Sequence, residues 1–370
     1  MATLSGRQII KGFDLAFMTM TAVLLLIGLA ALYSFALHVA KPDYSFLLKQ
    51  TAFAAAGFAA VGLLMRFDYR RLAGIHWLLY GIAVASLVVV LMFGRTVHGT
   101  TGWFVLGGLQ LQPVEFVKII MTIVLAKFFS DHGHELHRFS IVAASGLLTA
   151  VPVGLVMLQP DLGSAVVIVG IWIGLLIILP IPKKFLGAIV AGLIVTAVIG
   201  WFGFLHPYQK DRLLNFFNPG RDPLGSGYNV RQAVTAIGSG LLSGRGLGLG
   251  PQSQLNFVPE RQTDFIFATI GEELGFIGAT IVIVAFGIFF WRLRQLLAKT
   301  RDSFSFLLGV SLGMMLFIQV AINIGMNLGL FPVTGIPLPF LSYGGSSLIA
   351  SFLAVGLLES MVIRQRFTPL

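Results

Sequence analysis

Long apolar runs, broken only by short polar segments, are the feature of this 370-residue sequence that most restricts its fold. Only 11% of the residues are charged, against about 25% in ordinary soluble domains, while 56% are hydrophobic. So few charges cannot cover the surface of a water-soluble protein, and so many apolar and aromatic residues are not typical of a disordered chain. The sequence therefore predicts an all-α polytopic membrane protein.

Several kinds of chemistry are excluded or disfavoured by composition. The sequence contains no cysteine, which excludes disulfides, thiol nucleophiles and Cys-ligated metals. We do not assign its net charge of +10 to nucleic-acid binding, because the basic residues fall in short clusters between apolar runs. His132, His134 and His137 resemble a metal site, but they lack the His-Glu-x-x-His pattern, and we predict no metal ligands among them.

Stretches of about 20 mostly apolar residues predict ten transmembrane helices in one domain covering residues 1–370. Arg7 and Lys11 precede the first stretch, and no small-residue cleavage pattern follows it, so we interpret it as a helix and not as a cleavable signal. The predicted spans are 13–38, 46–65, 72–93, 113–130, 140–158, 162–179, 185–205, 264–290, 304–330 and 342–363.

Basic residues are distributed unevenly between the two sides of this topology. Most Lys and Arg residues fall on the side that holds both termini, whereas the short loops of the opposite side carry only Lys41, Lys49 and Arg95. By the positive-inside rule, both termini are therefore cytoplasmic. Residues 206–263 then form a large extracytoplasmic loop between the seventh and eighth helices, and loops of this length are usually functional.

Charged residues inside the predicted spans are functional candidates, because charge at membrane depth is energetically costly. Glu115 and Lys118 lie three residues apart on one helix face. They fit either an ion pair that fixes helix packing or the polar wall of a substrate cavity. Asp161 sits at a tight turn and is expected to be a helix N-cap.

The long loop re-enters the membrane through a segment that carries Asp264, Glu272 and Glu273. Either Thr263 or Asp264 could simply cap the eighth helix. If the helix is continuous from Asp264, Glu272 lies about 12 Å along its axis and about 80° around it. Asp264 and Glu272 could then face one cavity, with Glu273 packed elsewhere.

The same loop is rich in glycine and carries Arg221, Arg231 and Arg245. Backbone amides in glycine-rich turns can bind anions, and arginine can bind phosphate through two hydrogen bonds. A flexible outer loop would have a similar composition. A carboxylate beside these cations suits a reaction in which a general base activates a sugar hydroxyl and cations hold a pyrophosphate leaving group. A transporter for an anionic lipid would also use intramembrane charges and a basic cavity.

Six sequence motifs are spread over nearly the whole chain. They are Gln-Pro-Val-Glu-Phe-Val-Lys (112–118), Gln-Pro-Asp-Leu-Gly (159–163), Asp-Pro-Leu-Gly-Ser-Gly-Tyr (222–228), Gln-Ser-Gln-Leu-Asn-Phe-Val-Pro-Glu-Arg-Gln-Thr-Asp-Phe-Ile-Phe-Ala (252–268), Gly-Glu-Glu-Leu-Gly (271–275) and Pro-Leu-Pro-Phe-Leu-Ser-Tyr-Gly-Gly-Ser-Ser (337–347). In this order they resemble the motifs of the SEDS family (shape, elongation, division and sporulation), and the resemblance is closer to the elongation members than to the division members.

This resemblance implies a peptidoglycan glycosyltransferase that polymerises lipid II on the outer face of the bacterial plasma (inner) membrane, for cell elongation and rod shape. It implies a class B penicillin-binding protein as transpeptidase partner, undecaprenyl-linked glycan as a second substrate, and other membrane proteins of the elongation complex. Asp264 falls on the family's essential aspartate, and Gln262 stands where a histidine is common.

The reaction predicted from this resemblance assigns Asp264 as the catalytic residue. Basic residues, with or without a divalent cation such as Mg²⁺, would offset charge on the leaving group; no other cofactor is predicted. A lipid II flippase or other lipid transporter is the alternative, and a silent scaffold for the transpeptidase is a third. The residues predicted to bind substrate are Glu115, Lys118, Asp161, Arg221, Arg231, Arg245, Glu272 and Ser342.

Overall fold

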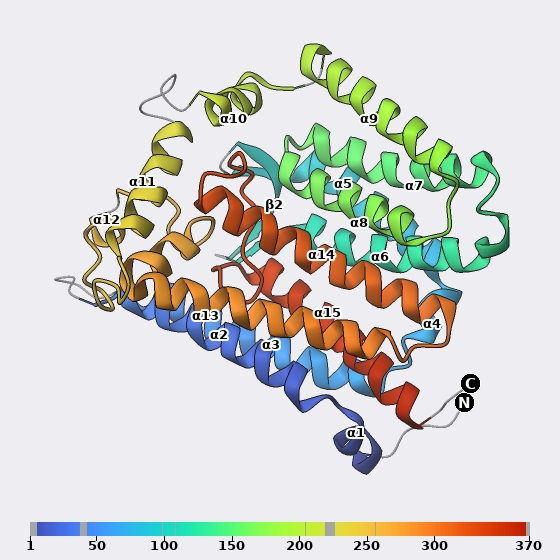
Figure 1. Ribbon diagram of the computed structural model, residues 1–370, viewed down its shortest axis with the longest axis horizontal. Helices are drawn as coiled ribbons and strands as arrows, with labels where there is room; N and C mark the ends of the chain where they lie inside the picture. The colour runs from blue at the N-terminus through green and yellow to red at the C-terminus, as the bar shows by residue number, and fades with distance from the viewer. Residues whose placement is uncertain are drawn as a thin grey trace. The chain divides into compact units, whose positions relative to one another are not determined.

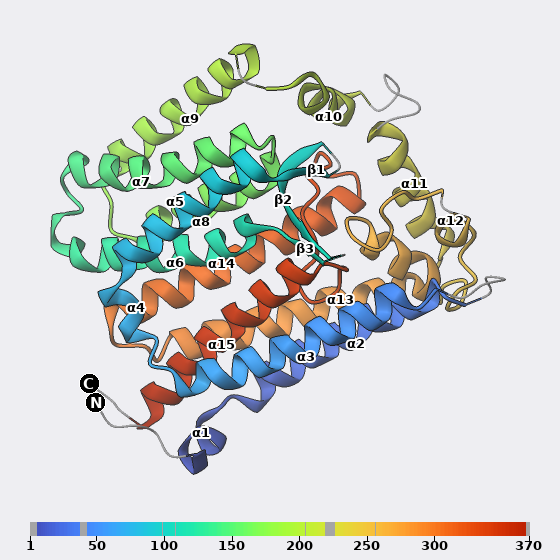
Figure 2. The same ribbon diagram turned by 180° about the vertical axis from the view of Figure 1, so that it is seen from behind.

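The computed structural model describes residues 6–37, 43–97, 99–107, 109–203, 205–218, 226–255 and 257–367 (Figures 1 and 2). Within these ranges, eight helices are long and apolar enough to cross a membrane, and a further apolar helix, Leu162–Ile178, is shorter. The prediction of a helical membrane protein is confirmed. The fourth predicted span forms a helix that carries several charged residues, and the total of ten spans stays a prediction.

Its contacts divide the chain into two compact units, formed by residues 1–67, 211–298 and 319–369 and by residues 68–210 and 299–318. The first unit contains α1 (Gly6–Gly12), α2 (Leu15–Ser34), α3 (Ser45–Arg66), most of α10 (Pro207–Phe217), α11 (Ser226–Ser239), α12 (Pro251–Gln254), α13 (Ile266–Leu297), the end of α14 (Ser303–Asn327) and α15 (Gly345–Phe367). Three helices therefore lie within the stretch predicted as one large loop.

In the first unit, α3 and α15 lie side by side (Figures 1 and 2). The last carbonyls of α3 have no partners within their own helix, and α15 supplies them. Arg364 donates to the carbonyls of Met65 (3.3 Å) and Arg66 (3.1 Å), and the Ser360 hydroxyl donates to that of Phe67 (2.8 Å). Two polar side chains inside an apolar helix thus close the end of its neighbour.

Helix α13 is broken at Gly275, whose φ of 65° and ψ of −162° are not helical. A break inside an apolar span leaves backbone groups that must find other partners, because lipid offers none. The segment 241–246 provides them. Phe276 and Ile277 donate to the carbonyls of Leu241 (2.8 Å) and Leu242 (3.1 Å), and the carbonyls of Glu272 and Glu273 accept from residues 245 (3.0 Å) and 246 (2.9 Å).

The glycine-rich part of the loop is therefore a packed partner of the broken helix and not an open chain. A Cβ added at Gly240 would lie 2.0 Å from the carbonyl oxygen of Gly271, so only glycine allows this approach. The amides of Arg245 and Gly246 are engaged by α13, which leaves them unsuited to the anion-binding role considered from the sequence.

The second unit contains α4 (Arg70–Gly74), α5 (His76–Phe93), α6 (Pro113–Asp131), η1 (Gly133–Glu135), α7 (Phe139–Leu158), α8 (Leu162–Ile178), α9 (Lys183–Gly203) and the first part of α14. A three-stranded antiparallel sheet connects α5 to α6, with β1 (Arg95–Val97), β2 (Thr100–Leu106) and β3 (Leu109–Leu111) in sequence order. Helix α6 packs against α5 and α8, which buries most of its residues.

Replacing Gly240 by alanine tests the packing of the glycine-rich segment. Because the new methyl group would meet the carbonyl of Gly271, we expect Gly240→Ala to destabilise the protein by about 1–3 kcal/mol. The measurement is thermal unfolding in detergent. Gly238→Ala is the matched control, since a Cβ there meets nothing within 4 Å, and its melting temperature should not fall. Equal melting temperatures for the two variants would contradict this packing.

Candidate functional site

Glu115 and Lys118 form a buried ion pair at the start of α6. Pro113 occupies the first turn of the helix, where its missing N–H costs nothing, as expected from the sequence. The Lys118 ammonium lies 2.8 Å from the Glu115 carboxylate, and the two side chains are only 1% and 4% exposed. The ion-pair interpretation is confirmed, whereas a direct contact of either residue with substrate stays a prediction.

Asp161 is the N-cap residue of α8, as predicted, and its carboxylate accepts a hydrogen bond from the amide of Ser164 at 2.9 Å. Its other oxygen accepts from the side-chain amide of Gln112 at 3.2 Å. Gln112 immediately precedes Pro113 and is the N-cap residue of α6. The second unit thus joins the two Gln-Pro motifs, which are far apart in sequence, through the starts of two helices.

Asp264 lies in the first unit, just before α13. The alternative in which Thr263 or Asp264 only caps this helix is wrong, because α13 begins at Ile266 and its N-cap residue is Phe265. The Asp264 carboxylate is half-buried and faces Gly335, where an added Cβ would lie 3.6 Å from Oδ2. The carboxylate therefore lies beside the proline-rich segment that precedes α15.

Three consecutive carbonyls at Gln262, Thr263 and Asp264 are held by donors from elsewhere in the first unit. The amide of Tyr343 donates to Gln262 (2.8 Å), and the Ser342 hydroxyl donates to Thr263 (2.5 Å). Ser342 is 2% exposed, and its oxygen also accepts from the amide of Leu338. The Ser342 hydroxyl thus binds two backbone groups, the carbonyl of Thr263 and the amide of Leu338. The substrate-binding role predicted for Ser342 stays a prediction.

The carbonyl of Asp264 accepts from the side-chain amides of Asn323 and Asn327, both at 3.0 Å. These two asparagines near the end of α14 are completely buried. They were not selected from the sequence, although two amides spaced by four residues in an apolar span are a recognisable signal of a buried polar contact on one helix face.

Glu272 is completely buried and does not face a cavity together with Asp264. Asp264 lies outside the helix, so the calculation of its angle to Glu272 along a continuous helix does not apply. The Glu272 carboxylate instead accepts from the amides of Gln252 and Ser253, each at 2.8 Å, and from the Ser253 hydroxyl. Glu272 therefore secures α12 against α13.

The arginines predicted to bind pyrophosphate lie in different surroundings. Arg231 on α11 and Arg245 after it are exposed, and Arg245 donates to the carbonyl of Ser239 at 2.8 Å. Arg221 lies outside the described residues. Arg261 precedes Asp264 by three residues, and its guanidinium carbon lies 4.6 Å from the ring centroid of Phe35. Burial lowers the pKa of the Arg261 guanidinium, and the carboxylates of Glu273 and Glu272 act in the opposite direction.

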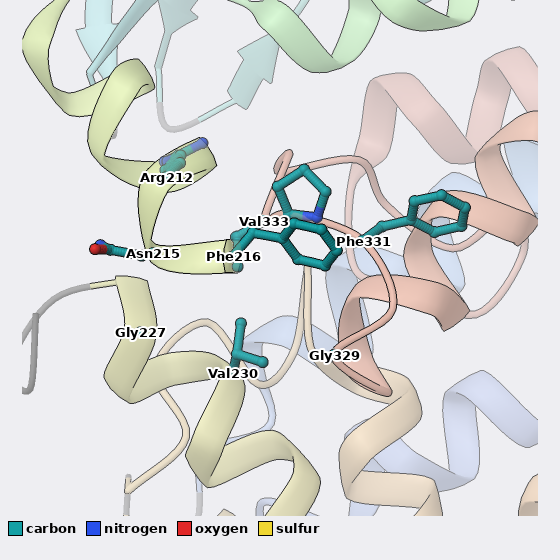
Figure 3. Close-up of a pocket in the computed structure, with 9 residues that line it drawn as sticks. Arg212, Asn215, Phe216, Gly227, Val230, Gly329, Phe331 and Val333 are labelled. Carbon is teal, nitrogen blue, oxygen red and sulfur yellow. The ribbon is translucent and has the colours of Figure 1, made fainter. Parts of the chain in front are cut away.

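A small cavity in the first unit lies between α10, α11 and the segment that follows α14 (Figure 3). None of the described residues predicted to bind substrate lines it. Arg212 and Asn215 supply polar groups, and the remaining lining is mainly apolar. The lining residues are Arg212, Asn215, Phe216, Gly227, Val230, Gly329, Phe331, Pro332 and Val333.

Within the described ranges, no three carboxylate or imidazole side chains gather in a way that could hold a metal ion. We therefore assign no residues to the divalent cation that the sequence left open.

Known proteins are similar to this chain over almost its whole length. A family profile described as "Cell cycle protein" and named for FtsW, RodA and SpoVE matches residues 14–366. Stage V sporulation protein E of Bacillus subtilis is 38% identical, with 96% of this chain and 98% of that protein covered. Peptidoglycan glycosyltransferase MrdB of Escherichia coli is 36% identical over 76% of each chain.

Solved structures resemble the fold as well. A chain from a structure described as "Structural coordination of polymerization and crosslinking by a peptidoglycan synthase complex" matches with a TM-score of 0.82 and 33% identity, covering 96% of this chain and 99% of that one. RodA of Thermus thermophilus matches with a TM-score of 0.69 and 30% identity, covering 96% and 98%.

The apolar helices define a multi-pass membrane protein. The chain belongs to the FtsW/RodA/SpoVE family, the same SEDS family whose motifs its sequence resembles.

Removing either partner of the buried ion pair should destabilise the protein, because the remaining charge loses its only described counter-ion. We expect Glu115→Gln or Lys118→Met to cost about 3–5 kcal/mol, and the double variant to recover most of this loss. Thermal unfolding in detergent measures the effect. Lys127→Met is the control on the same helix, because its pair with Asp131 is 27% and 44% exposed and should contribute about 1 kcal/mol or less. Strictly additive losses in the double variant would contradict the pairing.

Proposed function

We propose that this chain is a peptidoglycan glycosyltransferase that polymerises lipid II. The observation that carries the proposal is the carboxylate of the half-buried Asp264, on a backbone that four separate donors hold in place. Relatives that are 34% and 36% identical are named peptidoglycan glycosyltransferase, one of them as a probable FtsW. Asp264 also falls on the aspartate position of the family motif at 252–268.

The proposed chemistry is a glycosyl transfer with Asp264 as general base. Its carboxylate takes the proton from the 4-hydroxyl of the acceptor GlcNAc, and that oxygen bonds to the anomeric carbon of the terminal MurNAc on the growing chain. The bond from this carbon to undecaprenyl pyrophosphate breaks, and the pyrophosphate leaves with the electron pair. Basic residues of the loop, such as Arg231 and Arg245, offset its charge.

The topology proposed for this activity has ten spans with both termini in the cytoplasm of a bacterium. Helices occupy all ten stretches predicted from the sequence, and the positive-inside rule favours this orientation. The loop that leads to Asp264 then lies on the extracytoplasmic side of the plasma membrane, where lipid II is polymerised. The partner we propose is a class B penicillin-binding protein, since a structural neighbour belongs to a peptidoglycan synthase complex.

Replacing Asp264 by asparagine tests the catalytic role. The amide keeps the shape of the side chain but cannot accept the proton, so Asp264→Asn should reduce lipid II polymerisation by at least about 10²-fold. The assay measures glycan strands made from purified lipid II by the chain together with its transpeptidase. Asp43→Asn, which changes an exposed carboxylate, is the control and should retain the native rate. Native polymerisation by a folded, partner-bound Asp264→Asn protein would refute the role, and lipid II movement across vesicles without polymerisation would favour the transporter.

We further propose the elongation role, because the motif at 252–268 resembles the elongation members of the family. Relatives named for division and for sporulation also match, so the test must separate these roles. Expressed in a rod-shaped bacterium depleted of its elongation member, the chain together with its own transpeptidase should restore rods. Rescue of filaments after depletion of the division member, with cells depleted of the elongation member remaining round, would instead assign it to division.

A further inference from the structure

Two buried amides on α14 contact the backbone of the proposed catalytic residue. The Asn323 Nδ2 group donates to the carbonyl of Asp264 at 3.0 Å and to that of Ile336 at 2.8 Å. The Asn327 Nδ2 group donates to the same carbonyl of Asp264 at 3.0 Å and to the carbonyl of Asn323 at 2.8 Å. Both lone pairs of the Asp264 carbonyl are therefore used by side chains from one helix.

The orientation of the Asn327 amide follows from its surroundings. Its oxygen accepts from the backbone amide of Ala268 at 3.0 Å, while its nitrogen faces carbonyl oxygens. A flipped amide would place oxygen against oxygen and N–H against N–H. Ala268 lies in the first turn of α13, which has no side-chain cap of its own. Asn327 thus caps α13 and holds Asp264 with one side chain.

Asn323 connects the two segments on either side of the carboxylate. One segment carries Asp264, and the other carries Ile336, next to the Gly335 that faces Oδ2. A single planar amide that donates to both carbonyls fixes the distance between these segments. Buried amides in an apolar span are costly unless their bonds are satisfied, so any shift of either segment is opposed by the loss of a hydrogen bond.

We infer that Asn323 and Asn327 are positioning residues, which set the place and direction of the Asp264 carboxylate through its own main chain. The inference rests on the proposed catalytic role of Asp264. Neither amide touches substrate in this account, and neither takes part in proton transfer. Because a general base must meet its proton at hydrogen-bond distance, a displacement of about 1 Å can cost about 10²-fold in rate.

The test measures kcat and KM for lipid II separately, together with the melting temperature, on the purified chain and its transpeptidase. Asn327→Leu removes the donors to Asp264 at similar volume, while the amide of Ala268 keeps its bond to the carbonyl of Phe265 (3.0 Å). Asn323→Leu removes both donors at similar volume. We expect kcat to fall about 10- to 100-fold in both variants, with KM changed less than about twofold.

Ser360→Ala is the matched control, because it also removes a buried side-chain donor from a backbone carbonyl, that of Phe67. Ser360 lies near the C-terminal end of α15, whereas Asp264 is close to the segment that precedes this helix. It should keep the native kcat even where its melting temperature falls as far as that of the asparagine variants. Native kcat in Asn327→Leu, or a loss of kcat in Ser360→Ala as large as in the asparagine variants, would overturn the inference.

Asp264→Asn, assayed in parallel, separates this inference from the proposed function. If Asp264→Asn is inactive while both asparagine variants keep native kcat, only the positioning role is wrong. If Asp264→Asn keeps native kcat, the catalytic assignment fails, and the positioning role fails with it.

Discussion

The proposed site depends on the hydrogen bonds that other segments donate to the backbone just before α13. The carbonyls of Gln262, Thr263 and Asp264 each accept hydrogen bonds from side chains or amides distant in sequence. This segment is neither helix nor strand, and the amides of Thr263 and Asp264 donate only locally, to the carbonyl of Glu260 (both 3.1 Å). Donors on α14 and before α15 bind these carbonyls, and moving the segment would break those bonds, which gives a general base the support it requires.

At two other places in the first unit, the backbone groups at a break or at an end of a helix are bound by specific partners. At Gly275 the glycine-rich segment takes up the amides and carbonyls that α13 releases, and Glu272 secures the short helix that follows this segment. At the end of α3, Arg364 and Ser360 play the equivalent part. Since lipid provides no hydrogen bonds, these polar residues bind backbone groups that the membrane would leave unpaired.

Features that depend on neighbouring residues could be predicted from the sequence, whereas contacts with distant backbone groups could not. Apolar runs, the Glu115–Lys118 spacing and the N-cap at Asp161 depend on local rules, and the structure agrees with each. The part played by Glu272 could not be predicted, because it depends on where α13 begins and on a break that brings a distant loop against it. The contacts of Asn323 were missed for a related reason: a polar residue in a span identifies itself, but its partner is set by tertiary packing.

The role proposed for Asp264 requires its carboxylate to contact the acceptor sugar. A cryo-EM structure of the chain with its transpeptidase and bound acceptor lipid II would test this contact. The donor used in the experiment would be an analogue that cannot release its pyrophosphate, so that no transfer takes place. We expect the carboxylate to lie within about 3 Å of the acceptor 4-hydroxyl. An acceptor hydroxyl bound away from Asp264, with another group at hydrogen-bond distance from it, would show that Asp264 is not the general base.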